Sequence, residues 1–218
     1  MSTTPTTRPR WGFLIALAAV AVVMRLAPQL LVKLSSAGYD MTSVSHPWGF
    51  TPMLAIGLYV GAFLKNRWHA IAFVLGMQLI GDLGIWALSG DVMQGFELGS
   101  LGVYVAYPLC ALLGRALNQH RSWGRVQVGS LLTCTVFFLT TNFFVWAFGR
   151  FSSPELAALY PLTFSGLMKC YEFGLPFAKE FISTPLFSAL LFSPLGVAQV
   201  SGVLADQQGT REFAAEAV

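Results

Sequence analysis

Charged side chains are scarce in this chain of 218 residues: Asp, Glu, Lys and Arg make up only 11% of it, against about 25% in an ordinary soluble domain. Because hydrophobic residues reach 55%, the composition excludes a disordered chain and argues against a soluble globular one. The formal net charge of +3 is small and the basic residues are dispersed, which sets nucleic-acid binding aside. Three cysteines, Cys110, Cys134 and Cys170, form no CxxC pair, no zinc-ligand spacing and no disulfide framework, so we expect small buried hydrophobes.

Motifs of nucleotide-using and hydrolytic enzymes are absent as well. The sequence contains no P-loop, HExxH, GxSxG or dinucleotide fingerprint, so it carries no ATPase of its own. The polar groups singled out inside its apolar segments, the acid Asp82, the cation Arg25 and the amide Asn142, include no acidic pair for metal or phosphoryl chemistry. We therefore expect no enzymatic activity, no metal and no cofactor. The lack of an internal inverted repeat disfavours a carrier built from two halves.

Apolar segments dominate the chain. A helix needs roughly 20 residues to cross a hydrocarbon layer about 30 Å thick, and six segments reach or approach that length. They cover about residues 11–31, 51–65, 68–88, 98–117, 126–148 and 181–200. The expected fold class is an all-α integral membrane protein, with one six-helix transmembrane domain over residues 11–200. Short tails, 1–10 and 201–218, flank this domain.

The distribution of Lys and Arg predicts the orientation, because positive residues are retained in the cytoplasm. Eight lie on the side of the termini: Arg8, Arg10, Lys65, Arg67, Arg115, Arg121, Arg125 and Arg211. Four lie on the other side: Lys33, Arg150, Lys169 and Lys179. Both termini are therefore expected in the cytoplasm, with the chain a multi-pass protein of the inner (cytoplasmic) membrane. A signal peptide has a similar opening, but the cleavage-like residues 19–21 lie within the first apolar run rather than after it.

Two opposite charges are predicted to share one depth in the bilayer. Arg25 and Asp82 each lie 14 residues from the cytoplasmic end of their segments, or about 21 Å along a helix. A charge inside a span costs at least about 2.5–3.5 kcal/mol on insertion scales, so it persists where it is paired, hydrated or useful. One interpretation is a structural ion pair between two helices, and the other is that one of the two charges binds a ligand.

Asn142 and Trp146 lie near the same depth on the fifth segment, one helical turn apart on one face. An amide at this place either joins two helices by a hydrogen bond or binds a ligand. The tryptophan either anchors the helix at the membrane interface or stacks on the ligand. Their coincidence in depth with Arg25 and Asp82 favours the ligand hypothesis for the whole group.

Two outer segments are too aromatic and polar for plain solvated loops. Residues 149–180 carry Tyr160, Tyr171 and Glu172, and are expected either to cover an outward-facing pocket as a lid or re-entrant segment, or to form a short interfacial helix. Residues 46–51 carry His46, whose imidazole either is solvated or contacts the ligand.

A GxxxG pattern, Gly57 and Gly61, occurs in the second apolar segment. Small residues at this spacing allow helices to approach closely. The pattern either serves packing within the chain or presents a contact surface to a partner membrane protein.

Several stretches together resemble an uncharacterised bacterial family, a domain of unknown function, which is itself similar to the substrate-binding S components of energy-coupling-factor (ECF) vitamin transporters. The first are Arg25-x-x-Pro28, Phe50-Thr51-Pro52, Ala55, Gly61-Ala62, Asp82, Gly114-Arg115, and the run Phe137-Phe138-x-Thr140-Thr141-Asn142-Phe143-x-x-Trp146. The others are Tyr160-Pro161, Gly166-Leu167, Cys170-Tyr171, Pro176-Phe177 and Leu191-Phe192, so that the resemblance covers roughly residues 20–195.

The resemblance implies six helices, cytoplasmic termini, an outer ligand pocket capped by loops, and a helix with small residues that meets a transmembrane coupling protein. This chain departs from the family at residues 183–185, Ser-Thr-Pro where the family often has Gly-Asp, and at Gly49-Phe50, where it has Asn-Phe. No vitamin-specific signature is recognisable, so the resemblance does not carry a substrate with it.

Two hypotheses of function follow. The first is a small-metabolite-binding subunit of an uptake transporter, powered by separate ATPases through a membrane coupling protein. Its substrate-binding candidates are Arg25, His46, Asp82, Asn142, Trp146, Tyr160, Tyr171 and Glu172. The second is a structural or assembly membrane protein that binds no small molecule and contacts its partners through Gly57 and Gly61.

Overall fold

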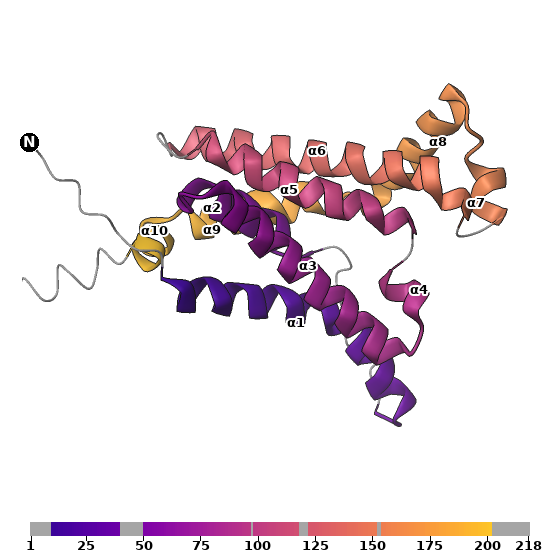
Figure 1. Cartoon of the computed structure of the whole chain (residues 1–218), viewed down its shortest axis with the longest axis horizontal. Helices are drawn as coiled ribbons and strands as arrows, with labels where there is room; N and C mark the ends of the chain where they lie inside the picture. The colour runs from indigo at the N-terminus through magenta and orange to yellow at the C-terminus, as the bar shows by residue number, and fades with distance from the viewer. Residues whose placement is uncertain (1–9, 40–49, 97, 118–121, 152–153, 202–218) are drawn as a thin grey trace, which may run out of the picture.

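Helices and turns make up the described part of the chain, which comprises residues 10–39, 50–96, 98–117, 122–151 and 154–201 of a computed structural model (Figure 1). No strand occurs in these ranges, which confirms the all-α prediction. The longer helices are α1 (Trp11–Ser36), α2 (Met53–Phe63), α3 (Arg67–Ser89), α5 (Leu101–Arg115), α6 (Trp123–Phe148), α8 (Phe164–Gly174) and α9 (Glu180–Leu191). The shorter elements are α4 (Val92–Gly95), η1 (Leu98–Ser100), η2 (Gly149–Phe151), α7 (Pro154–Leu159), η3 (Leu175–Phe177) and α10 (Pro194–Ser201).

Three helices are long and apolar enough to cross a membrane: α1, α3, and α6 together with η2. Large apolar side chains stay exposed along them, among them Val23 on α1, Ile80 on α3 and Leu131 on α6. A soluble protein rarely leaves so much apolar surface in water, whereas lipid tolerates it. These three helices indicate a membrane protein.

The other three predicted spans form helices too short to cross the layer unaided. Helices α2, α5 and α9 contain 11, 15 and 12 residues. At 1.5 Å per residue they are about 17, 23 and 18 Å long, against a hydrocarbon layer of about 30 Å. The predicted run 181–200 is interrupted because α9 ends at Leu191 and α10 begins at Pro194. A proline disfavours the helical conformation of the residue before it, so the chain turns at this point.

Helix α2 forms the centre of the bundle. Each of its residues from Met53 to Ala62 is buried, and the helix packs against α1, α3, α5, α6 and α9. Directly after its C-terminus, the carbonyl oxygens of Leu64 and Lys65 accept hydrogen bonds from the Arg115 guanidinium, with the Nη1 atom 3.5 and 3.2 Å away. Helix α2, an apolar and short helix, is therefore surrounded by other parts of the protein.

The crossing of α2 and α5 depends on a glycine in each helix. A Cβ atom on Gly61 would overlap the carbonyl oxygen of Ala111, and one on Gly114 would overlap the carbonyl oxygen of Leu58. Gly57 is less confined, since a Cβ there would lie 3.6 Å from Val74 Cγ1. Both glycines of the GxxxG pattern are thus buried between the chain's own helices. Their burial favours the internal-packing interpretation over the hypothesis that they present a surface to a partner protein.

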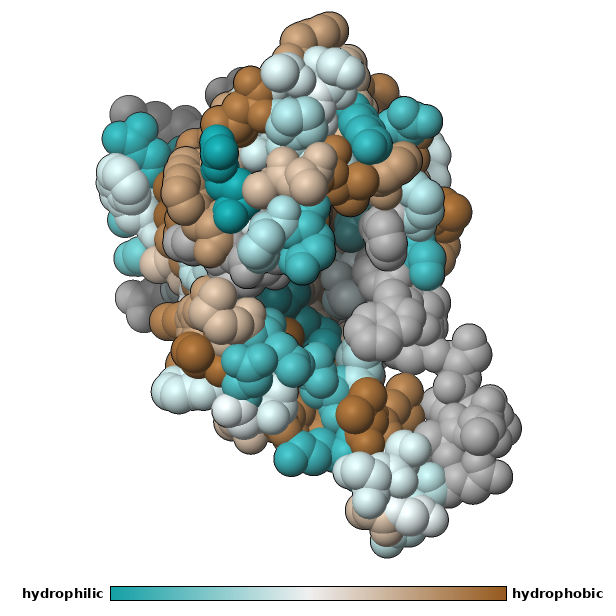
Figure 2. Space-filling model, turned by 90° about the vertical axis from the view of Figure 1, so that its right-hand side faces the viewer, coloured by the Kyte–Doolittle hydropathy of each residue, from teal (hydrophilic) through white to brown (hydrophobic). Residues whose placement is uncertain are grey.

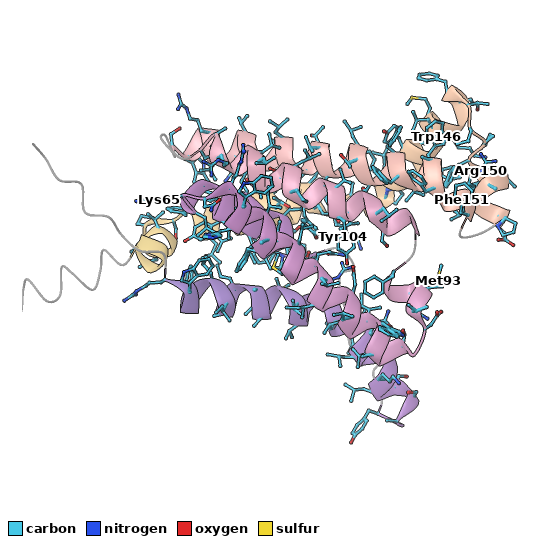
Figure 3. All side chains as sticks on the ribbon, viewed as in Figure 1. Lys65, Met93, Tyr104, Trp146, Arg150 and Phe151 are labelled. Atoms are coloured by element: carbon cyan, nitrogen blue, oxygen red, sulfur yellow. The ribbon has the colours of Figure 1, made fainter. Side chains whose placement is uncertain are left out.

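The two ends of the described chain lie at the same end of the molecule. The start of α1 packs against α10, on the left of Figure 1, and Lys65 lies at this end in Figure 3. Helices α4, α7 and α8 lie at the opposite end, together with Trp146, Arg150 and Phe151 (Figures 1 and 3). Helix α1 changes direction in its second half, where Pro28 removes a backbone donor from the helix interior.

Candidate functional site

The charges predicted to share one depth are in contact. The Arg25 Nη2 atom donates to Asp82 Oδ1 over 2.5 Å, which joins α1 to α3. Gln78, one turn before Asp82, donates its amide to both carboxylate oxygens at 3.0 and 2.9 Å. The Tyr104 hydroxyl of α5 donates to Asp82 Oδ2 over 2.6 Å, and Figure 3 shows Tyr104 between these helices. Three helices therefore meet at one carboxylate.

Two glycines of α3 make this approach possible. A Cβ on Gly81 would lie 2.7 Å from Arg25 Cδ, and one on Gly84 would lie 2.8 Å from a methyl group of Leu26. Such distances are far below van der Waals contact, so only glycine lets the Arg25 stem lie flat on α3. The pair is thus built by backbone proximity as well as by charge.

The members of this network differ in their remaining capacity for hydrogen bonds. Asp82, with 1% of its side chain exposed, accepts four hydrogen bonds, which fills the usual sites of a carboxylate. Arg25 is 26% exposed and uses one of its five N–H groups in the network, and its Nε atom is buried without a partner. A further polar group could bind to Arg25 and not to Asp82.

One face of α6 carries the predicted amide. Cys134, Phe137, Phe138, Thr141 and Asn142 recur at the i, i+3, i+4, i+7 and i+8 spacing that places side chains on one side of a helix. Together they line a cavity of about 200 Å³, whose other wall is formed by residues at the junction of α8 and α9. These residues are Gly174, Ala178, Glu180 and Phe181.

Asn142 is held in this cavity by its own helix and by a glycine opposite. Its Nδ2 atom donates to the Phe138 carbonyl oxygen over 2.8 Å, and its side chain oxygen lies directly against the Gly174 backbone. A Cβ on Gly174 would overlap this oxygen. The side chain therefore has one orientation imposed from both sides, which is what a ligand-binding amide needs.

The outer segment is attached to α6 by hydrogen bonds from two aromatic side chains, one on α6 and one on α8. The Trp146 indole donates to the Pro161 carbonyl oxygen over 3.0 Å, and the Tyr171 hydroxyl donates to the Leu139 carbonyl oxygen over 3.1 Å. The Cys170 thiol, whose pKa is raised by burial, stays protonated and donates to the backbone oxygen of Asn142. These contacts hold the short helices of the outer segment against α6, beside the cavity, and fit both a segment that covers a pocket and a short interfacial helix.

Of the eight predicted binding residues, the structure places one, Asn142, in the wall of this cavity. Trp146 lies on α6 and donates to Pro161 of the outer segment, while Tyr160 and Tyr171 belong to that segment, the cover of the cavity in the proposal below. Tyr160 packs edge-on against Phe173, with ring centroids 6.3 Å apart. Glu172 is exposed on α8. Arg25 and Asp82 form the separate network described above, and His46 lies outside the described residues.

Sequence reasoning missed Glu180, Thr141 and the three phenylalanines of the cavity. The helical spacing of the α6 residues was available as a signal, because four of them fall in the stretch that resembles the uncharacterised family. Glu180 was assigned to the end of a connecting segment, and only the packing of α9 against α6 reveals that it lines the cavity.

A larger hollow of about 540 Å³ lies between α1 and α3, but its wall is apolar, with side chains such as Ala19, Val23 and Ile80. It has no polar group to orient a soluble ligand. Figure 2 shows the end of the molecule formed by α4, α7 and α8, where hydrophilic and apolar residues mix around a hollow between its upper and lower parts. No group of three or more metal-binding side chains occurs within the described ranges.

Comparison with known proteins gave one match. The chain matches the model of a family of unknown function, DUF6580, over residues 5–205. This agrees with the resemblance to an uncharacterised family that the sequence motifs indicated. Searches of the curated proteins and of the solved structures each found no match.

Proposed function

The chain belongs to the DUF6580 family, and from that premise and the geometry of the cavity beside α6 we propose that it is the small-metabolite-binding subunit of an uptake transporter. Separate ATPases would supply the energy through a transmembrane coupling protein, and the chain itself would not be an enzyme. In this proposal it is an S-component-like multi-pass protein of the inner membrane, with six membrane segments and both termini in the cytoplasm.

The observation that carries the proposal is the cavity between α6 and the junction of α8 and α9. A helix bundle that only needed to be stable would fill such a space with side chains, because each void costs packing energy. Here about 200 Å³ remains, next to the amide of Asn142 and the hydroxyl of Thr141. Pockets for drug-sized ligands span roughly 300–1,000 Å³, so the cavity suits a smaller metabolite.

The cover over the cavity supports the same function. Trp146 and Tyr171 attach the outer segment by single hydrogen bonds to backbone oxygens, and much of α8 remains exposed. A segment held by a few such bonds opens at low free energy, as binding-site lids do. A ligand could enter from the outer side while the bundle around α2 stays intact.

The Arg25–Asp82 network is proposed to support the site rather than form it. Because the Asp82 carboxylate already accepts four hydrogen bonds, it has no site left for a ligand, whereas Arg25 retains free donors. The coupling protein is not proposed to contact Gly57 and Gly61, because both are buried.

The experiment that tests the proposal is affinity purification from the native host in a mild detergent, with mass spectrometry of the retained proteins and small molecules. Recovery of a membrane coupling protein with its ATPases, or of a metabolite in near-stoichiometric amount, supports it. Recovery of a different membrane complex without either would instead favour a structural or assembly protein with no small-molecule ligand.

A pair of variants on α6 connects the result to the cavity. Asn142→Ala should release the retained metabolite while the protein remains extractable and monodisperse. Thr135→Ala, on the exposed side of the same helix, is the matched control and should retain it. Equal retention by both variants would show that the cavity is not the binding site.

A further inference from the structure

The cavity beside α6 has acidic but no basic side chains in its wall. Glu180 is the one charged residue among those that line it, and the remaining polar side chains are Thr141, Asn142 and Cys134. A carboxylate taken partly out of water needs a positive partner or strong hydrogen bonds. The wall thus presents to whatever occupies the cavity a carboxylate that has no ion-pair partner among the described residues.

Within the described residues, no side chain forms an ion pair with the Glu180 carboxylate, and Lys179 acts on it only through its charge at a longer distance. No Lys, Arg or His nitrogen of these residues lies within ion-pair distance of the Glu180 carboxylate, and the neighbouring Lys179 has an exposed side chain. The nearest fixed positive group is the N-terminus of α9 itself, where an acidic residue is stabilising. The favourable interaction with the N-terminus of α9 explains why residue 180 is acidic, but not why its side chain lines a cavity.

Hydrogen-bond acceptors continue along α9 beyond Glu180. One turn on, Ser183 is fully buried, and its hydroxyl oxygen has no hydrogen-bond partner. Thr133, which precedes the cavity residue Cys134 on α6, is buried with an unpartnered hydroxyl as well. Neither hydroxyl lines the cavity, so the side-chain oxygens available to a ligand there are those of Glu180, Asn142 and Thr141.

Three aromatic rings complete the wall: Phe137, Phe138 and Phe181. The rings of Phe138 and Phe181 meet nearly edge to face, with centroids 6.4 Å apart and planes at 72°. The faces of aromatic rings attract cations, and rings set around a carboxylate are a recurrent arrangement for ammonium groups. The same rings also suit an apolar ligand body.

We propose that the cavity binds a small organic cation, a protonated amine on an apolar or aromatic body, with Glu180 as its counter-ion. The ammonium group would donate to the Glu180 carboxylate and to the Asn142 side chain oxygen. The phenylalanine rings would enclose the apolar body. This rests on the proposed function and adds the chemical class of the ligand to it.

The test is calorimetric titration of the full-length protein in lipid nanodiscs with three compounds of nearly the same shape: benzylammonium, benzyl alcohol and benzoate. Benzylammonium should bind, and benzoate should not bind measurably. Glu180→Gln should weaken benzylammonium binding by about tenfold or more, which corresponds to about 1.4 kcal/mol. Glu155→Gln, the same change at an exposed acid of α7, is the matched control and should leave the affinity unaltered.

A second variant keeps the test informative if Glu180→Gln folds poorly. Phe138→Leu removes a ring but keeps an apolar side chain, and should weaken benzylammonium binding about threefold to tenfold without weakening benzyl alcohol binding as much. Tighter binding of benzoate than of benzylammonium, no binding of benzylammonium by folded wild-type protein, or equal affinity in Glu180→Gln would each overturn the proposal. If a coupling protein or a neutral or anionic metabolite is nevertheless recovered from the host, the ligand class alone is wrong and the transport function stands.

Discussion

Replacing Asp82 by asparagine should show whether the network around this carboxylate stabilises the fold. The change keeps the shape of the side chain and removes its charge. Tyr104 can turn its hydroxyl to accept from the new amide, because a hydroxyl is both donor and acceptor. Arg25 has no acceptor, so it keeps one oxygen as its partner and loses the opposite charge.

The magnitude follows from the burial of the two partners. Removing one member of a buried ion pair typically costs 3–5 kcal/mol, because the other charge is left uncompensated. Asp82 is almost fully buried, but Arg25 keeps 26% of its side chain exposed and can be partly hydrated. We therefore expect Asp82→Asn to lower the free energy of unfolding by about 3 kcal/mol, near the lower end of that range. Asp82→Ala, which also leaves Gln78 and Tyr104 unpaired, should cost about 5 kcal/mol.

The assay is equilibrium unfolding in mixed micelles with increasing SDS, followed by far-ultraviolet circular dichroism. The double variant Arg25→Gln with Asp82→Asn removes both charges, and should recover most of the loss, to within about 1 kcal/mol of wild type. Additive losses in the double variant would refute the ion-pair reasoning. Unchanged or increased stability of Asp82→Asn would refute it as well, because the charge of Asp82 would then contribute nothing to the stability of the fold.

Three further predictions concern packing, the cavity and its cover. Gly61→Ala should destabilise the protein by about 3 kcal/mol in the same unfolding assay, because the new methyl group meets backbone of α5. Gly57→Ala, where that methyl group finds ordinary contact distances, is the control; equal losses would contradict the close helix crossing. Gly174→Ala should displace the Asn142 amide and so weaken benzylammonium binding about tenfold. The free energy of unfolding should stay within about 0.5 kcal/mol of wild type. A normal affinity would argue against that amide as a ligand contact. Trp146→Phe should remove the hydrogen bond to Pro161, worth about 1 kcal/mol, and speed backbone amide hydrogen exchange in α7 and α8. Hydrogen exchange followed by mass spectrometry measures this. Unchanged exchange would show that the indole does not hold the outer segment against α6.

The sequence predicted the helices and the ion pair because both depend on periodic, local information. Counting residues from the ends of two apolar segments was enough to place Arg25 and Asp82 at one depth, and the structure joins them. Helix length was predicted less well. The apolar run 181–200 continues through residues 192–194, where the helix is interrupted between Leu191 and Pro194. Packing between segments was not predictable in this way: the GxxxG pattern of Gly57 and Gly61 is the same whether its face meets another protein or α5.

The candidate site was predicted for Asn142 alone because depth in a bilayer says nothing of direction around a helix axis. Trp146, one turn from Asn142, was placed on the same face, but its indole reaches the Pro161 oxygen rather than the cavity. Glu180 was missed because it lies at the start of a helix, where an acidic residue is common and does not by itself indicate a binding site. Only the packing of α9 on α6 makes it part of the wall.

The central position of α2 has a consequence for how the protein is made. Chains emerge from the ribosome N-terminus first, so α2 is synthesised before α3, α5, α6 and α9, which later surround it. A helix about 17 Å long cannot hold itself across the hydrocarbon layer, and its close contact at Gly61 exists only once Gly114 has been added. The innermost helix must therefore wait near the membrane surface or beside α1 until its partners arrive. After α1, synthesis proceeds from the innermost helix to those that surround it, and nascent chains that stop before α5 should be those most dependent on insertion chaperones.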